Sequence, residues 1–168
     1  NVDAEKSLLG AILIDEEVLA DVAEITKVID FYFFFYSIIY DGMIRLYERR
    51  SPVDLLTLTD ELKKRGDLDT IGGSSYLSEL TNYVPTAAHA KSYADIVSQA
   101  AVRRRLIRAG GEISDLAFNE ELSVPQLLGQ NEAELFNVSD QSLKQDLTSI
   151  EEILDESFER LDELYKNK

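Results

Sequence analysis

Apolar residues recur along most of the chain at the three- and four-residue intervals of amphipathic helices. Near the start, Leu8, Leu9 and Ile12 follow Asp3, which can cap the first helix. Prolines and glycines fall between the apolar stripes, with Gly66 placed where a left-handed helix end belongs. No strand has a comparable signal, so we expect an all-α fold. A first helix follows Asp3, others cover about 16–25, 37–49, 55–65 and 90–118, and one more starts near Ser74.

The pattern after residue 118 predicts a partner for the longest helix. Ser123 and Gln126 have the spacing of a capping box, and Val124, Leu128 and Leu135 follow at intervals of 4 and 7. Residues 90–118 and 124–138 are therefore expected to form an antiparallel helical hairpin. Gly110-Gly111 interrupts the first of these helices at a cost of about 2 kcal/mol relative to two alanines, which a kink or a close helix–helix approach could explain.

The end of the chain has a different pattern. Residues 139–147 are polar, as in a linker, and Ser149 with Glu152 opens a last amphipathic helix over about 149–166. A lone amphipathic helix after a linker is expected to dock on another subunit, or on a domain absent from this chain. The predicted organisation is a helical head over 1–89, the hairpin over 90–138, and a linker with its helix over 139–168.

Charge narrows the class of partners. The 168 residues include 17 Lys+Arg against 32 Asp+Glu, a formal net charge of −15. Because nucleic-acid binding depends on neutralising phosphates, little direct nucleic-acid binding is expected, and anionic membranes are disfavoured for the same reason. There are no cysteines, no secretory signal and no apolar run of about 20 residues, so we expect a cytoplasmic protein.

Catalytic motifs are missing from the sequence. No glycine-rich loop ends in Lys-Ser/Thr, and Gly72-Gly73 is interpreted as a turn before a helix. His89 is the only histidine and stands in a predicted loop, so a metal site there is not expected. The carboxylates lie beside lysines and arginines on helix faces. The sequence thus predicts no catalytic, cofactor or metal site.

Two local clusters allow two interpretations each. Arg103-Arg104-Arg105 with Arg108 could contact an anionic partner or pair with this chain's own surplus acid; four arginines at these positions do not share one helix face. The run Phe31–Tyr36 could be an exposed aromatic contact surface, or a mostly buried helix entry with one or two rings exposed. The second interpretation is favoured for both clusters.

Three segments together resemble a known family. They are Glu5–Leu13; Asp54–Leu58 followed by Leu62 and Ile71–Leu77; and Pro85–Ala88 followed by Tyr93–Val97 and Arg104–Ile107. In this order and spacing they are similar to the amino-terminal domain of the bacterial replicative DNA helicase, the DnaB family. The resemblance covers about residues 2–138, and the tail over 139–168 resembles that family's linker and linker helix.

The resemblance implies a place in DNA replication. Family heads pair through their hairpins, and a trimer of dimers builds the collar of a hexameric helicase in the cytoplasmic bacterial replisome. The motor domain, which binds ATP and Mg, follows the linker. The fragment is therefore expected to have no cofactor and no enzymatic activity, whereas a full-length parent would be an ATP-dependent DNA helicase.

The resemblance also implies partners and contact residues. The dimer seam maps to Leu106, Ile107, Ile113, Leu116, Leu128 and Leu135. The carboxy-terminal domain of primase is expected to contact Phe118, Leu122 and Val124, with Tyr83 and Tyr93 as further contacts. The linker helix is expected to dock on a neighbouring motor domain through Ile150, Leu154, Phe158, Leu161 and Leu164.

The sequence departs from the family pattern at one place. Family members usually have polar residues and a histidine after the Asp-Phe-Tyr entry, whereas this chain has Phe33-Phe34-Phe35-Tyr36-Ser37 after Asp30-Phe31-Tyr32. The departure concerns contacts made by that loop and leaves the hairpin unaffected.

The alternative to a helicase collar domain is a helical adaptor of similar fold, such as the helicase-binding domain of primase. An adaptor of this kind would bind helicase collars rather than a second copy of itself.

Overall fold

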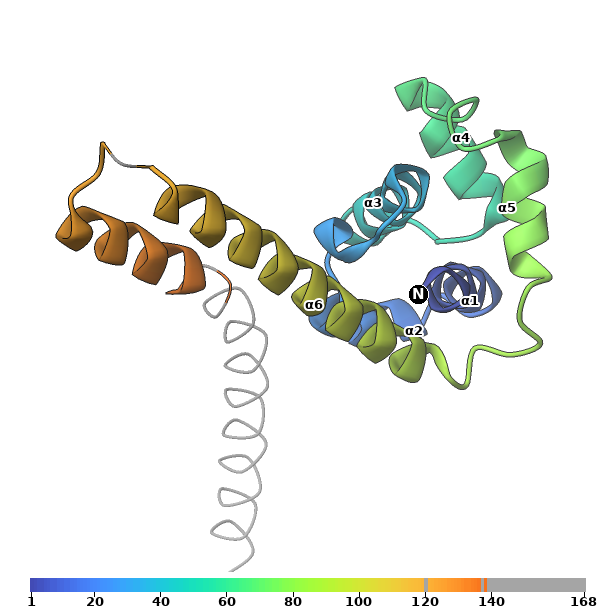
Figure 1. Cartoon of the computed structure of the whole chain (residues 1–168). Helices are drawn as coiled ribbons and strands as arrows, with labels where there is room; N and C mark the ends of the chain where they lie inside the picture. Colours follow the sequence, from blue (N-terminus) through green and yellow to red (C-terminus); the bar gives the residue numbers. More distant parts are fainter. Residues whose placement is uncertain (120, 137, 139–168) are drawn as a thin grey trace, which may run out of the picture. The chain divides into compact units, whose positions relative to one another are not determined.

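The structure, a computed structural model, describes residues 1–119, 121–136 and 138. Helices, turns and bends make up this part of the chain, and it contains no strand, which confirms the all-α prediction (Figure 1). The main elements are α1 (Val2–Ile14), α2 (Val18–Ile25), the short 3-10 helix η1 (Val28–Asp30), α3 (Phe34–Glu48), α4 (Leu55–Arg65), α5 (Gly73–Thr81) and α6 (Ala90–Ala117). The predicted linker and its helix lie outside the described residues.

The chain divides into two compact units. The first is Asn1–Arg103 and holds α1 to α5 with the beginning of α6, and the second starts at Arg104 within α6. The domain boundaries predicted from the sequence at 89/90 and 138/139 stay predictions.

Helix α1 is the centre of the first unit. It contacts α2, α3 and α5, and the side chains of Leu8, Leu9 and Ile12 are fully buried. Its cap differs from the prediction, because the side chain of Asn1 rather than Asp3 accepts the N–H of Ala4 (3.2 Å). The helix begins earlier than its apolar stripe, so Asp3 falls within its first turn.

Two helices begin at residues other than those predicted. Helix α2 starts at Val18 instead of residue 16, and α3 starts at Phe34 instead of residue 37. The earlier start of α3 follows from packing, because Tyr36 is buried and its hydroxyl lies 3.0 Å from the hydroxyl of Tyr76 on α5. The α3 helix therefore includes half of the aromatic run.

The ends of α4 follow the sequence prediction. The carboxylate of Asp54 accepts the backbone N–H groups of Leu56 and Thr57, both at 2.9 Å. The hydrogen bond from the Thr57 backbone is the largest cause that lowers the pKa of Asp54, because it favours the charged carboxylate. At the other end, Gly66 has φ +77°, the left-handed conformation predicted for it.

The beginning of α6 belongs to the core of the first unit. Ala90, Ala94 and Val97 are buried with the α1 side chains in one cluster. The hydroxyl of Thr26, at the end of α2, donates to the carbonyl oxygen of Ala94 (3.0 Å), and the hydroxyl of Tyr40 donates to the carbonyl oxygen of Thr26 (2.9 Å). These buried bonds join segments that are far apart in the sequence.

The end of α3 has an unusual residue. Arg50 has φ +56°, the only positive φ of a residue other than glycine in the described chain. Its N–H donates to the carbonyl oxygen of Tyr47 (2.9 Å), and the N–H of Ser51 donates to that of Leu46 (3.0 Å). This is the Schellman arrangement, in which glycine usually occupies the left-handed position because a Cβ is strained there.

Replacing Arg50 with glycine is expected to stabilise the protein. Relief of the left-handed strain outweighs the greater entropy of glycine in the unfolded chain, so Arg50→Gly should raise the free energy of unfolding by roughly 0.5–1 kcal/mol. Urea denaturation followed by circular dichroism measures the change. The matched control is Gly66→Ala, which has open space around the added Cβ and should lose about 1 kcal/mol. A lower stability of Arg50→Gly would contradict the strain assignment.

Candidate functional site

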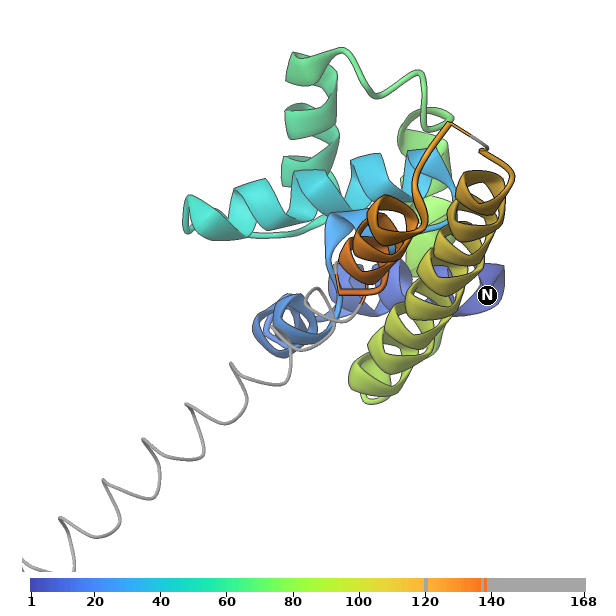
Figure 2. The same cartoon turned by 60° about the vertical axis from the view of Figure 1, so that its left-hand side comes forward.

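The second unit contains most of the described part of the predicted hairpin, whose first residues, 90–103, belong to the first unit. The end of α6 and a helix over 124–136 run side by side in both views, with residues 118–119 and 121–123 of the connection described between them (Figures 1 and 2). The backbone N–H of Ser123 donates to the side-chain oxygen of Gln126 (3.0 Å), one half of the predicted capping box. The two helices confirm the hairpin expected from the sequence over this range.

Some apolar residues of the hairpin face inward. Ala109 is buried, and Ile113 and Leu116, at the helical spacings of 4 and 7 from it, are partly buried. Leu127 on the second helix is also partly buried. Ile113 and Leu116, two of the six predicted dimer residues, therefore contribute at least in part to packing within one chain.

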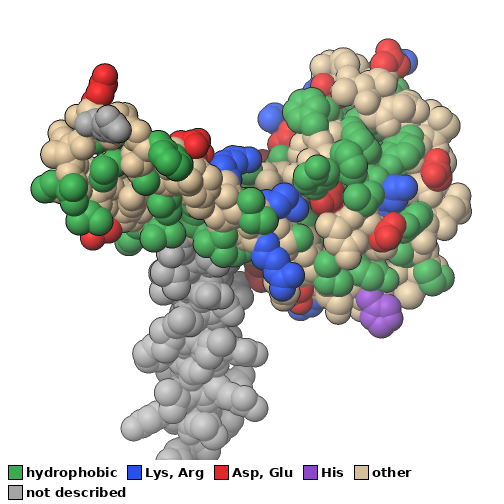
Figure 3. Space-filling view, viewed as in Figure 1, with side chains coloured by type: hydrophobic (Ala, Val, Ile, Leu, Met, Phe, Trp, Pro, Cys, Tyr) green, Lys and Arg blue, Asp and Glu red, His purple; other side chains and the backbone are tan. Residues whose placement is uncertain are grey.

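A second set of apolar residues faces outward. Leu106 and Leu135 are each 49% exposed, Leu128 is 59% exposed and Ile107 is 76% exposed, and Phe136 extends this set beyond the residues predicted from sequence. We call these five residues the hairpin apolar surface. Figure 3 shows hydrophobic side chains gathered over this unit. Exposed apolar side chains in such number are typical of a protein–protein contact.

The turn of the hairpin carries three of the five residues predicted to bind primase. Phe118 and Val124 are strongly exposed, and Leu122 is partly buried. A phenyl ring and a branched aliphatic side chain exposed on either side of one short turn offer an apolar contact. The resemblance implies these residues as primase contacts, and that role stays a prediction.

Tyr83 and Tyr93, the other two predicted contacts, belong to the first unit. The Tyr83 hydroxyl donates to the carboxylate of Asp3 (2.8 Å), and this hydrogen bond is the main cause that raises the pKa of Tyr83. The Lys6 ammonium lies 5.3 Å from the centre of the Tyr83 ring. Tyr93 is partly buried, with its ring centre 6.4 Å from that of His89.

The other motifs singled out in the sequence have structural explanations. Gly72 and Gly73 both have positive φ and form the predicted turn into α5. His89 is exposed beside Tyr93, and no group of three or more potential metal ligands occurs in the part of the chain described. Arg104 and Arg105 are partly buried and each interacts with other groups of the protein.

The aromatic run follows the favoured interpretation. Phe31 and Tyr36 are buried and Phe33 and Phe35 partly buried, whereas the rings of Tyr32 and Phe34 are exposed. The segment is thus a mostly buried helix entry with two exposed rings.

No helix in the described residues has the length and apolar content needed to cross a membrane.

Comparison with known proteins identifies the family. The model of the DnaB-like helicase N-terminal domain matches residues 1–99. The chain belongs to this family. The replicative DNA helicase DnaB of Leifsonia xyli is 42% identical over 136 residues, which is 81% of this chain. Similarly, the replicative DNA helicase DnaC of Bacillus subtilis is 34% identical over all 168 residues. A third relative, from Geobacillus stearothermophilus, is 36% identical over 165 residues, which is 98% of the chain and 36% of that relative.

Solved structures agree with this assignment. The N-terminal domain of the DnaB helicase from Mycobacterium tuberculosis is 37% identical and superposes with a TM-score of 0.79 over 82% of this chain and 96% of that one. A DnaB-like replicative helicase, described with its interactions with primase, matches with a TM-score of 0.69 at 24% identity, over 90% of this chain and 35% of that one. The latter likeness concerns the fold.

The chain spans only 30% and 37% of the lengths of the Leifsonia and Bacillus relatives. The matches therefore concern the amino-terminal part of replicative helicases.

Proposed function

We propose that this domain is a non-catalytic collar element of a hexameric replicative DNA helicase. In this role it joins helicase subunits through its hairpins and docks the carboxy-terminal domain of primase during bacterial DNA replication. Dimers form first and combine as a trimer of dimers. ATP and Mg belong to the motor portion of such a helicase, which lies in the cytoplasm with the replisome.

The observation that carries the assembly role is the hairpin apolar surface. Leu128 and Leu135 stand seven residues apart and so lie on one side of their helix, and both are exposed in the single chain. Burying several such side chains against a second hairpin removes apolar area from water, at roughly 25 cal/mol for each Å² buried. A second copy presents the same surface, as a two-fold interface requires.

The turn of the hairpin supports primase docking. A DnaB-like replicative helicase of the same fold has been described with its interactions with primase. Here Phe118 and Val124 are exposed apolar groups at the turn, and Leu122 is partly buried. We assign Tyr83 and Tyr93 to the same partner as contacts made by the first unit.

The predicted linker helix completes the proposal. Five of its residues are proposed to dock on a neighbouring motor domain, and all of them lie outside the described residues: Ile150, Leu154, Phe158, Leu161 and Leu164.

The alternative function is that of a helical adaptor, such as the helicase-binding domain of primase. The match to helicase N-terminal domains over residues 1–99 favours the collar role.

Self-association separates the two functions. The collar role predicts that the isolated chain forms dimers at micromolar concentration through the hairpin, whereas an adaptor would stay monomeric and bind a helicase collar. Sedimentation velocity over a concentration series measures this directly. A chain that remains monomeric at tens of micromolar would contradict the assembly role.

A further inference from the structure

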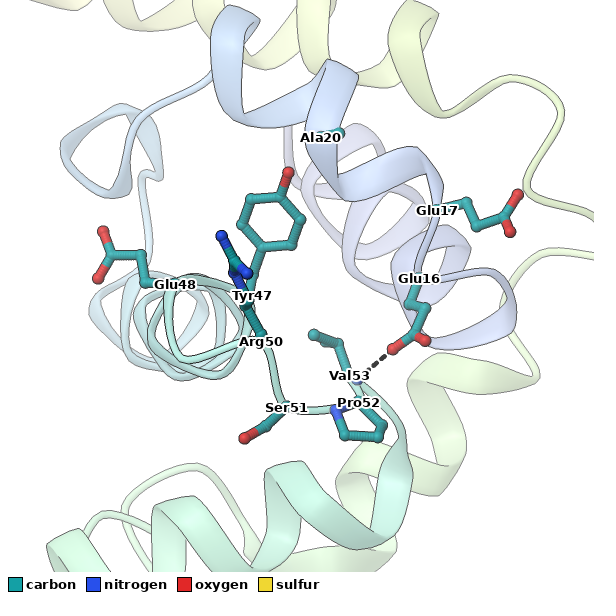
Figure 4. A pocket seen from close by; sticks show the side chains of 9 residues that line it. All are labelled: Glu16, Glu17, Ala20, Tyr47, Glu48, Arg50, Ser51, Pro52 and Val53. Carbon is teal, nitrogen blue, oxygen red and sulfur yellow. Dashed lines mark hydrogen bonds between the residues drawn. The ribbon is translucent and has the colours of Figure 1, made fainter.

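Contacts within the chain account for the unusual positions of the first unit. Beside the end of α3, the carboxylate of Glu16 accepts the backbone N–H of Val53 and ties the α1–α2 turn to the loop after α3 (Figure 4). The left-handed Arg50 of the same loop closes the last turn of α3 by its bond to the carbonyl oxygen of Tyr47. Each of these features is explained by the single chain.

The same holds for two glycines in the interiors of helices. A Cβ added to Gly10 on α1 would lie 2.3 Å from the carbonyl oxygen of Leu80 on α5. A Cβ added to Gly42 on α3 would lie 2.9 Å from the Cδ1 atom of Leu58 on α4. At both places the missing side chain lets two helices approach closely. A glycine inside a helix of the first unit thus marks a close helix contact.

The glycine pair of α6 has no such explanation in the single chain. Helix α6 continues through Gly110 and Gly111, and both are exposed (Figure 1). A Cβ added to either would have nothing within 4 Å in the described part of the chain. Neither has positive φ, unlike Gly66, Gly72 and Gly73. Because glycine lowers helix stability relative to alanine, the pair weakens α6 without a gain that the single chain shows. This points to a contact outside the single chain.

The glycine pair lies beside exposed apolar residues. Leu106 and Ile107 precede Gly110 by one helical turn, so they are its neighbours on α6, and they are 49% and 76% exposed. One turn after Gly110, the small residue Ser114 is also exposed. The pair is therefore a low place in the hairpin apolar surface, where a second helix can pack at or below the short end of the usual spacing of roughly 8–10 Å between helix axes.

The charges of α6 change sign at the glycine pair. From residue 103 to the end of the helix, the basic residues Arg103–Arg105 and Arg108 precede the pair, and the acidic residues Glu112 and Asp115 follow it. In an antiparallel crossing of two α6 helices at the glycine pair, the basic part of each helix lies along the acidic part of the other. A parallel crossing would place like charges together. Charge therefore favours an antiparallel second copy as the occupant of this surface.

We propose that Gly110 and Gly111 are the crossing point of two α6 helices in the dimer, and that the two helices run antiparallel about a two-fold axis. The proposal rests on the proposed self-association through the hairpin, and it adds the place of closest approach and the orientation of the two chains. A two-fold axis at the pair brings Ile107 of one chain near Ser114 of the second copy, because these residues lie equally far from the centre of the pair.

The addition of one methyl group tests the close approach. Gly110→Ala is expected to raise the dimer Kd about tenfold or more in sedimentation equilibrium, because the added Cβ overpacks the crossing point. At protein concentrations below that Kd, the same variant should resist urea at least as well as the unsubstituted chain, since alanine favours the helix. The control Glu112→Ala places an alanine at an exposed position on another side of α6 and should change the Kd by no more than about threefold.

Disulfide formation tests the orientation, since the chain has no cysteine of its own. Chains with Ile107→Cys are mixed with ¹⁵N-labelled chains with Ser114→Cys and oxidised gently, and mass spectrometry separates the mixed disulfide from the two like pairs. The mixed disulfide should exceed the share expected from random pairing, because the antiparallel crossing brings these two positions within the reach of a disulfide. An excess of like pairs would overturn the antiparallel arrangement.

The results separate this proposal from the assembly role. If the unsubstituted chain dimerises and Gly110→Ala dimerises equally well, the crossing at the glycine pair is wrong while self-association stands. If the unsubstituted chain stays monomeric at tens of micromolar, both are wrong.

Discussion

Gly10→Ala is expected to destabilise the first unit by about 3 kcal/mol. A Cβ at Gly10 would lie 2.3 Å from the carbonyl oxygen of Leu80 and 3.3 Å from its carbonyl carbon. Because these are backbone atoms of α5 rather than the end of a flexible side chain, the clash can be relieved only by moving α1 away from α5. That movement would open the core around Leu8 and Leu9.

Urea denaturation followed by circular dichroism measures this loss. The matched control is Gly110→Ala in α6, where nothing lies within 4 Å of the added Cβ. Alanine has the higher helix propensity there, so this variant should gain up to about 1 kcal/mol. If Gly10→Ala were as stable as the unsubstituted chain, the close packing of α1 on α5 would be wrong.

Leu128→Asp is expected to weaken self-association by about 100-fold or more. In the proposed dimer the leucine is covered by the second hairpin, so the substitution would bury an unpaired carboxylate at a cost of several kcal/mol. In the single chain Leu128 is 59% exposed, so the same change should cost the fold little. The head is therefore expected to stay helical while the dimer is lost.

Sedimentation equilibrium measures the dimer, and circular dichroism checks the fold. Leu135→Asp should behave in the same way, because this residue lies on the same side of the helix. The control is Leu56→Asp, which introduces the same charge at a leucine of α4 that is 79% exposed and outside the hairpin. If the Leu128→Asp protein kept its oligomer size, Leu128 would not belong to the interface.

Local signals predicted the helices well. Helix α4 begins after Asp54 and ends before Gly66, as predicted. A capping carboxylate and a left-handed glycine act through neighbouring backbone groups, so a short stretch of sequence is enough to predict both ends. The predicted start of α3 was wrong, because the true start depends on the contact between Tyr36 and Tyr76, which lie 40 residues apart. The local pattern of apolar residues does not contain such a long-range contact.

The candidate surface was predicted only in outline. The resemblance placed Ile113, Leu116 and Leu128 on one seam, but the sequence could not separate the partly buried residues from the exposed Leu128, since that depends on how the two helices pack. The unusual backbone of Arg50 was missed, because no motif marks this residue and only its positive φ distinguishes it from the other arginines.

Calorimetric titration of this chain with a bacterial primase carboxy-terminal domain tests the central claim most directly. The proposed collar role predicts saturable binding, with about one primase domain for every two chains, because the docking sites belong to a dimer. An absence of heat at tens of micromolar, at both of two temperatures, would contradict primase docking and leave self-association as the only function supported.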